Sequence, residues 1–353
     1  MQRREFLKTS AAAGIAAWTA LSAAHVPGAN GRLRIGLIGC GPRGMFDARN
    51  MRGAGPNPRH VEIAAVCDAD PARTRAARRC APHASAYADF RHLLADRTID
   101  AVIIATPPPC HAPMLILACE AAKDVYLETP VMCRLAEAQP IREAVRRTGR
   151  IVQIGSQFRS AAHIAEAARI VQSGRIGPVK FVRAWNHCFD SVHQIMGADM
   201  PLTVSAAKRG LARISPPLRN FVPVPALLLD ATYAYPDFVL SSEVSLDDAR
   251  HPPRMAFHGA EATLFVDRAG LELYPGGRLR QRQPDPSPLH AQRFVDCVRT
   301  RRHPLAGIEV ATRAAAIACL ANVAAWTGRK LTWDAASWHF PADPDANQYL
   351  FRE

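Results

Sequence analysis

Three glycines with the spacing G-x-G-x-x-G follow an apolar, strand-like run, Arg34–Ile38. In folds that bind dinucleotides, the first glycine permits a tight turn, the second lets a pyrophosphate approach the backbone, and the third lets a helix pack closely on the strand. The first N–H groups of that helix then face the phosphates. The spacing therefore predicts a phosphate-binding loop made of Gly39, Gly41, Pro42, Arg43 and Gly44.

A carboxylate follows the next strand-like run. Val61–Cys67 is largely apolar and ends at Asp68, 24 residues after Gly44. A carboxylate at this place accepts hydrogen bonds from the adenosine ribose and repels a 2′-phosphate, so Asp68 favours NAD over NADP. The alternative is that Asp68 only caps the following helix, although Asp70 is better placed for that role.

Two further strand-like runs also end in residues that could contact a cofactor. Asp100–Ala105 leads into Thr106 and Pro107, and Asp124–Leu127 leads into Glu128. The carboxyl ends of parallel strands line the ligand crevice of such a sheet, so we expect these residues to lie beside the cofactor. This edge is where the chemistry should take place.

Two of the polar residues at this edge have a second interpretation. Glu128 either lies by the nicotinamide ribose or caps the helix that follows it. His111 opens the helix after Pro107, and we expect it to be a cofactor-side packing or capping group rather than an acid–base.

The elements that must position these residues alternate between strand and helix through the first half of the chain, which predicts parallel βαβ units and an α/β fold. After Ala161 the pattern changes. A helix is expected at Ile164–Val171, followed by strands at Val179–Trp185, Ala226–Ala234, Phe238–Val244, Met255–His258, Ala262–Val266 and Leu271–Tyr274. The stretch Pro275–Pro288 is predicted as a loop, and closing helices are expected at about Leu289–Thr300 and Val310–Thr327.

Composition is typical of a globular protein with two domains. The chain has 353 residues, of which 48% are hydrophobic. Its nine cysteines include no C-x-x-C pair, so neither a disulfide framework nor a metal site is expected, and the thiols are interpreted as small buried apolar groups. The net charge is +13, but the basic residues do not cluster, so no nucleic-acid partner is expected.

The first thirty residues differ from the rest. They contain Arg3 and Arg4, then the Ala-rich apolar run Ala11–Ala24. This pattern indicates a twin-arginine signal peptide over residues 1–30 and an exported, periplasmic protein, because the run is too short and too weakly apolar to span a bilayer. An uncleaved anchor or a basic tail is the alternative. We expect no other apolar run to be long enough to span a membrane.

The chain resembles the Gfo/Idh/MocA oxidoreductases from Leu33 to about Asp334. The motifs that carry the resemblance are Gly39–Gly44, Ala105–Pro107 with His111, Val125–Pro130, Val152–Ser160 and, for the exported branch of the family, Ala324–Asp334. The resemblance implies NAD as cofactor, a sugar or polyol as substrate and a homo-oligomer formed through the C-terminal sheet.

The same resemblance implies two domains. An NAD-binding Rossmann domain would span residues 33–158. An α+β domain with an open, mostly antiparallel sheet would span residues 159–340, and its closing helices at 289–327 would pack near the first domain.

Two departures from the family pattern affect the predicted catalytic site. Thr129 stands where most members have lysine, so an ammonium group is replaced by a neutral hydroxyl. His187 matches the family's catalytic histidine, but the segment that usually precedes it is missing, which implies a shortened C-terminal domain. Arg183 occupies the place of the aspartate that would orient the imidazole. His187 is therefore either the proton acceptor or a core histidine, and Arg159 is a candidate for the lost charge.

Three functions remain open from the sequence. The first is an NAD-dependent sugar or polyol oxidoreductase that works by hydride transfer. The second is a redox-neutral glycoside hydrolase or lyase in which NAD is reduced only transiently. The third is a degenerate NAD-binding protein without turnover, which the two departures favour.

Overall fold

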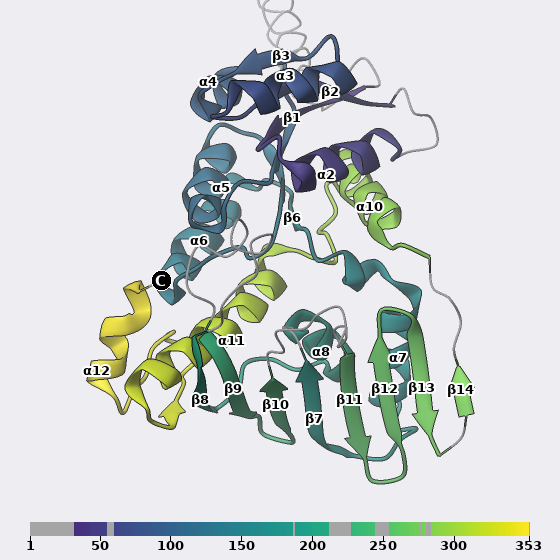
Figure 1. The fold of residues 1–353 in the computed structure, drawn as a ribbon, viewed down its shortest axis with the longest axis vertical. Coiled ribbons are helices and arrows are strands. Elements are labelled where there is room, and N and C mark those ends of the chain that lie inside the picture. Colours follow the sequence, from purple (N-terminus) through teal and green to yellow (C-terminus); the bar gives the residue numbers. More distant parts are fainter. Residues whose placement is uncertain are drawn as a thin grey trace, which may run out of the picture.

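A computed structural model describes residues 32–54, 60–185, 188–211, 227–243, 254–275, 277–279 and 284–352. The predicted signal peptide and His187 lie outside these residues. Within them the chain forms two sheets, one above the other in Figure 1, with the long helix α11 (Ile308–Thr327) between them.

The first sheet is parallel throughout, with strand order β3-β2-β1-β4-β5-β6. Its strands are β1 (Leu33–Ile38), β2 (Val61–Cys67), β3 (Ser85–Tyr87), β4 (Ala101–Ile104), β5 (Asp124–Leu127) and β6 (Val152–Ile154). The intervening helices are α2 (Pro42–Arg52), α3 (Pro71–Cys80), α4 (Phe90–Ala95), α5 (His111–Glu120) and α6 (Ala138–Thr148). This is the doubly wound order of a Rossmann domain, as predicted.

Burial explains why the strands of this sheet could be predicted from the sequence. Every residue of β4 and β5 is buried. Strands covered by helices on both faces are nearly continuous apolar runs, and these two are short runs of that kind. Their polar ends therefore stand out against the apolar background.

The second sheet has nine strands in the order β14-β13-β12-β11-β7-β10-β9-β8-β15. They are β7 (Val179–Trp185), β8 (Thr203–Leu211), β9 (Leu227–Ala234), β10 (Val239–Glu243), β11 (Arg254–Gly259), β12 (Thr263–Asp267), β13 (Gly270–Tyr274), β14 (Gly277–Leu279) and β15 (Leu331–Thr332). Among these pairings only β7 with β10 is parallel. The predicted fold class, a Rossmann domain followed by a mostly antiparallel sheet, is confirmed.

Three strands, β8, β14 and the two-residue β15, lie where the sequence did not predict them. β8 runs from Thr203 to Leu211, which carries too few apolar residues in alternation to indicate a strand. β14 lies within the predicted loop Pro275–Pro288, and it is ordered by pairing with β13 rather than by its own composition.

Two helices, α7 (Ala162–Gln172) and α8 (Phe189–Met196), accompany this sheet, and two more close the chain. α10 (Ser287–Thr300) packs on α2, and its buried Phe294 and Val298 belong to the core of the first domain. α11 contacts α6 of the first domain and α8 and β8 of the second. The short α12 (Pro344–Asn347) follows near the C-terminus.

α11 corrects one expectation about membranes. By length and composition alone, Ile308–Thr327 could cross a bilayer, and the sequence interpretation had overlooked it. In the structure, ten of its residues are buried, including Ile317, Leu320 and Ala324. A helix that packs against two domains contacts protein on several sides, so it is apolar around most of its circumference. Its composition therefore resembles that of a membrane span.

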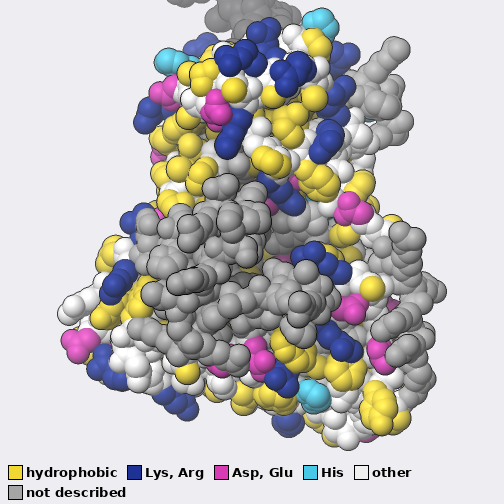
Figure 2. Space-filling model, in the orientation of Figure 1, with side chains coloured by type: hydrophobic (Ala, Val, Ile, Leu, Met, Phe, Trp, Pro, Cys, Tyr) yellow, Lys and Arg dark blue, Asp and Glu magenta, His cyan; other side chains and the backbone are white. Residues whose placement is uncertain are grey.

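The cysteines also differ from expectation. All nine lie in the described residues and none forms a disulfide, but only Cys40, Cys67 and Cys119 are buried, five others are partly buried, and Cys80 is exposed. On the face shown in Figure 2, the described lysine and arginine side chains are scattered among hydrophobic and acidic ones.

Candidate dinucleotide and substrate site

The glycine-rich loop is built as the spacing requires. Gly39 has a φ of +93°, and a Cβ there would lie 2.5 Å from the carbonyl oxygen of Ala105. A Cβ on Gly44 would lie 2.0 Å from the carbonyl oxygen of Gly39, so α2 can approach β1 only with glycine at this position. Both glycines are demanded by the fold itself.

Gly41 is different, and it provides the test of whether a cofactor fits. It has ordinary extended dihedrals, φ −69° and ψ 178°, and begins α2 as its N-cap. A Cβ there would meet only the Arg73 Nη1, at 4.0 Å. Nothing among the described residues requires glycine at this position, so the open backbone at the start of α2 fits a pyrophosphate that approaches closely.

Asp68 lies at the end of β2 beside this loop. Its Oδ2 accepts a hydrogen bond from the Cys40 N–H at 2.7 Å, and its Oδ1 accepts one from the Asp70 N–H at 2.9 Å. Asp70 itself caps α3 by accepting from the Ala72 N–H at 2.8 Å. The capping role thus belongs to Asp70, and Asp68 is held against the phosphate-binding loop.

Glu128 lies in a buried polar network rather than at an open strand end. Its Oε1 accepts from the Arg43 Nη2 at 2.7 Å and from the Gln157 Nε2 at 3.2 Å. Arg43 also lies 3.3 Å from the carboxylate of Asp47, which is only 3% exposed. A Cβ on Gly155 would lie 2.1 Å from Glu128 Oε1, so this glycine makes room for the carboxylate.

This network perturbs Asp47, which the sequence interpretation did not single out. Burial, followed by the nearby negative charge of Glu128, raises the pKa of Asp47 to about 8, against the opposing effect of Arg43. The sequence contains one signal for this residue, which is its spacing of four residues from Arg43 on the same predicted helix. Burial beside Glu128 therefore favours the protonated form of Asp47.

Thr106, Pro107 and His111 form the neighbouring loop. His111 Nδ1 lies 2.7 Å from the carbonyl oxygen of Pro130, and its Nε2 lies 2.8 Å from that of Thr106. His111 thus ties the loop after β4 to the loop after β5. Thr106 donates its hydroxyl to Met114 Sδ at 3.6 Å, whereas Pro107 is exposed.

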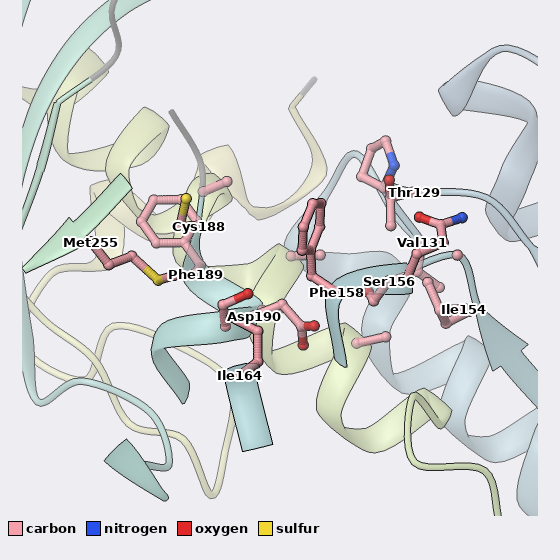
Figure 3. Close-up of a pocket in the computed structure, with 18 of the residues that line it drawn as sticks. Thr129, Val131, Ile154, Ser156, Phe158, Ile164, Cys188, Phe189, Asp190 and Met255 are labelled. Atoms are coloured by element: carbon pink, nitrogen blue, oxygen red, sulfur yellow. The ribbon is translucent and has the colours of Figure 1, made fainter. Parts of the chain in front are cut away.

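A cavity of about 600 Å³ begins where these strand ends stop. Its first wall comes from the Rossmann side and includes Thr129, Gly155 and Ser156. Its second wall comes from the C-terminal domain and includes Phe189 and Met255. Figure 3 shows Phe158 between the two walls, with Asp190 projecting beside it. The cavity therefore joins the expected nicotinamide end of the cofactor to the second domain.

Asp190 is an acidic residue of the cavity that the chain holds in place by hydrogen bonds. It accepts from the Arg159 Nε at 2.8 Å and from the Ser156 hydroxyl, while burial raises its pKa against these contacts. Arg159, suggested above as a replacement for the lost lysine, is 6% exposed and does not line the cavity. It supports Asp190 instead.

Two other basic residues are excluded as substitutes by their positions. Arg183 donates to Glu243 Oε1 at 2.9 and 2.6 Å, in the sheet. Lys123 donates to the carbonyl oxygens of Asp96 and Ile99, at the opposite end of β5. The described residues contain no group of three potential metal ligands.

Comparison with known proteins agrees with this geometry. Residues 33–156 match the Gfo/Idh/MocA family model, described as an oxidoreductase family with an NAD-binding Rossmann fold. This part of the chain is similar to the Gfo/Idh/MocA oxidoreductases. NAD is the cofactor for which this family's Rossmann domain is built, and the residues around Gly41 and Asp68 fit it.

Individual relatives are distant. The scyllo-inositol 2-dehydrogenase (NAD(+)) of Bacillus subtilis (strain 168) is 24% identical over 78% of this chain and 88% of its own length. The inositol 2-dehydrogenase of Salmonella typhimurium (strain LT2) is 33% identical, but over 41% of this chain and 43% of its own length. The crystal structure of GenD2 from gentamicin A biosynthesis, in complex with NAD, has a TM-score of 0.70 at 19% identity and covers 86% of this chain and 97% of that one.

Proposed function

We propose that the chain is an NAD-dependent oxidoreductase that moves a hydride between a carbon of a sugar or polyol and the nicotinamide. The cavity carries this proposal, because it connects the strand ends after β5 and β6 with the second domain at a single site. NAD supplies the hydride acceptor when bound. The names of the curated relatives, which are inositol dehydrogenases, support the substrate class.

The residues of the chain would position the substrate and exclude water from it. The apolar lining from both walls, including Val131, Phe189 and Met255, would keep water from the reacting carbon. Asp190 can accept a hydrogen bond from a substrate hydroxyl, and Arg159 fixes the orientation of its carboxylate. We assign the proton-accepting role to His187, which lies outside the described residues.

The departures from the family pattern remain part of this proposal. β7 ends at Trp185 and α8 begins at Phe189, so residues 186–188 are all that connects them. This short connection supports the proposed shortening before His187. Together with the neutral Thr129, it favours slow turnover, with a cofactor-binding protein that does not turn over as the second candidate.

A substrate screen tests the function. The purified protein, loaded with NAD, is incubated with sugars, polyols and aryl glycosides while NADH absorbance and glycoside cleavage are followed. NADH release that is lost in His187→Ala would support hydride transfer, and cleavage without net NADH would support the redox-neutral alternative. Bound NAD with neither activity would leave the protein without turnover and refute the proposal.

We also propose export and self-association. Arg3 and Arg4 support twin-arginine export, and changing both to lysine should leave the precursor in the cytoplasm.

Phe181 and Val239 are paired across β7 and β10 and are 39% and 36% exposed, which supports an oligomer formed through this sheet. Light scattering should then show a smaller particle for Phe181→Glu.

A further inference from the structure

The cavity has few charged side chains, and they differ in whether the chain already pairs them. Among the described residues that line it, the charged ones are Asp190, Asp267 and Arg268. The rest of the lining is apolar or neutral. A substrate that enters this space therefore meets a small number of charges, and each has a definable function.

Both carboxylates are already bound by the chain. Asp190 is paired with Arg159 at 2.8 Å. The Oδ1 of Asp267 accepts hydrogen bonds from the N–H groups of Ala269 at 2.7 Å and Gly270 at 3.1 Å, which closes the turn between β12 and β13. Asp267 thus shapes the turn that carries the next residue, Arg268.

Arg268 presents the cavity's only positive charge within the described part of the chain. Its guanidinium lies 5.5 Å from the ring centroid of Phe158, the residue that stands between the two walls in Figure 3. No ion pair links Arg268 to a carboxylate of the described residues. Stacking on a ring orients the guanidinium plane while its N–H edge stays available for a planar anion.

The charge of Arg268 acts inside the cavity and not only at its rim. Burial raises the pKa of the Cys188 thiol to about 12, and the charge of Arg268 opposes that rise. Cys188 lines the same cavity from the start of α8. Arg268 therefore lies close enough to a buried side of the cavity for its charge to be felt there.

We infer that Arg268 is a substrate-recognising residue and that the substrate carries a carboxylate, as uronic and aldonic acids do. This inference rests on the proposed function and narrows it. Arginine binds a carboxylate through two parallel hydrogen bonds, which a neutral hydroxyl cannot match. Thr129 leaves the Rossmann wall without a cation, and Arg268 supplies one from the opposite domain. Because a guanidinium stays protonated, its role is binding and positioning, not proton transfer.

The experiment compares acids with neutral sugars of the same ring. The NAD-loaded protein is titrated by calorimetry with glucuronate and glucose, and with galacturonate and galactose, and kcat/KM is measured for each pair. We expect at least one acid to bind about tenfold or more tightly than the neutral sugar of the same ring. The reason is that two charge-assisted hydrogen bonds to a guanidinium are stronger than hydrogen bonds between neutral groups.

Variants identify the residue responsible. Arg268→Gln should weaken binding of the acid roughly 10–100-fold and leave the neutral sugar almost unchanged, and Arg268→Lys should restore part of the loss. Arg254→Gln is the matched control, because Arg254 stacks on Phe265 at 4.5 Å in the same sheet and does not line the cavity. It should bind both ligands like the parent protein.

The outcomes separate the inference from the proposed function. Equal binding of acid and neutral sugar, an acid preference that survives Arg268→Gln, or no binding of either acid would overturn the inference, even if some neutral polyol yields NADH. Binding of an acid that depends on Arg268, without NADH from any substrate, would support the inference and refute the proposed dehydrogenase.

Discussion

The phosphate-binding loop and the cavity lie on the same Rossmann domain edge, yet they are assembled differently. The loop draws Gly39, Gly41 and Gly44 from six consecutive residues, and its geometry is set by the backbone. The cavity combines Thr129, Asp190 and Arg268, which lie far apart in the sequence and on two domains. A site made of local backbone tolerates little substitution, whereas a site made of distant side chains can exchange its charges between elements.

The largest expected effect tests the backbone requirement. In Gly44→Ala, the new Cβ would lie 2.0 Å from the Gly39 carbonyl oxygen, so α2 must move away from β1. We expect a loss of about 3 kcal/mol or more in the free energy of unfolding, together with loss of NAD binding. Denaturant unfolding and calorimetry with NAD would measure both.

Gly41→Val is the matched comparison. Its Cβ enters open space in the protein, so the free energy of unfolding should change little. NAD binding should fall by about tenfold or more, because the side chain occupies the place of the pyrophosphate. If Gly41→Val unfolds like Gly44→Ala, the distinction between a fold glycine and a ligand glycine is wrong.

A second change tests the cavity. In Arg159→Met, the Asp190 carboxylate loses its 2.8 Å partner in a site where only 21% of its side chain is exposed. Removing one member of a buried pair costs about 3 kcal/mol, because the remaining charge is unpaired. The double variant Arg159→Met/Asp190→Leu should recover most of that loss in thermal unfolding. If it does not, the pair contributes through packing rather than charge.

The difference between the two regions also explains what the sequence could predict. β4 and β5 were recognisable because they are buried apolar runs, and Asp68 because it ends such a run at the expected distance from Gly44. Arg268 and Asp47 were not recognisable. Arg268 lies in the turn between β12 and β13, which brings it to Phe158, and Asp47 gains its environment only when α2 packs beside Glu128. Tertiary contacts of this kind leave no local pattern at Arg268, and at Asp47 they leave only its spacing of four residues from Arg43.

The third prediction concerns cofactor choice. Asp68→Ser removes the carboxylate that we propose binds the ribose. Arg73 stays near Gly41, with its Nη1 4.0 Å from where a Cβ on Gly41 would lie. We expect the preference for NAD over NADP to fall by about 10–100-fold, since charge repulsion with a 2′-phosphate is lost. Calorimetry with both cofactors measures the ratio. Adding Arg73→Gln should weaken NADP specifically, and an unchanged ratio in Asp68→Ser would contradict the assigned role.

The last prediction is a dependence of stability on pH that comes from the loop side alone. Burial raises the pKa of Asp47 to about 8, well above its value in an unfolded chain. The folded protein therefore holds a proton that the unfolded chain releases. This contribution to stability is complete below about pH 4 and is lost progressively as the pH rises toward about 8.

Asp47→Asn should remove that dependence, because asparagine is a neutral analogue of the protonated acid. Relative to the parent protein, we expect the variant to gain stability as the pH is raised from about 5 to about 8, by up to about 1.4 kcal/mol per pH unit. Thermal unfolding at several pH values measures the difference between the two proteins, so the buried His193 and His290, whose pKa values are lowered to about 4 by burial, cancel. Asp70→Asn, an exposed helix cap, serves as control and should run parallel to the parent. A parallel curve for Asp47→Asn would mean that its proton is not held by burial beside Glu128.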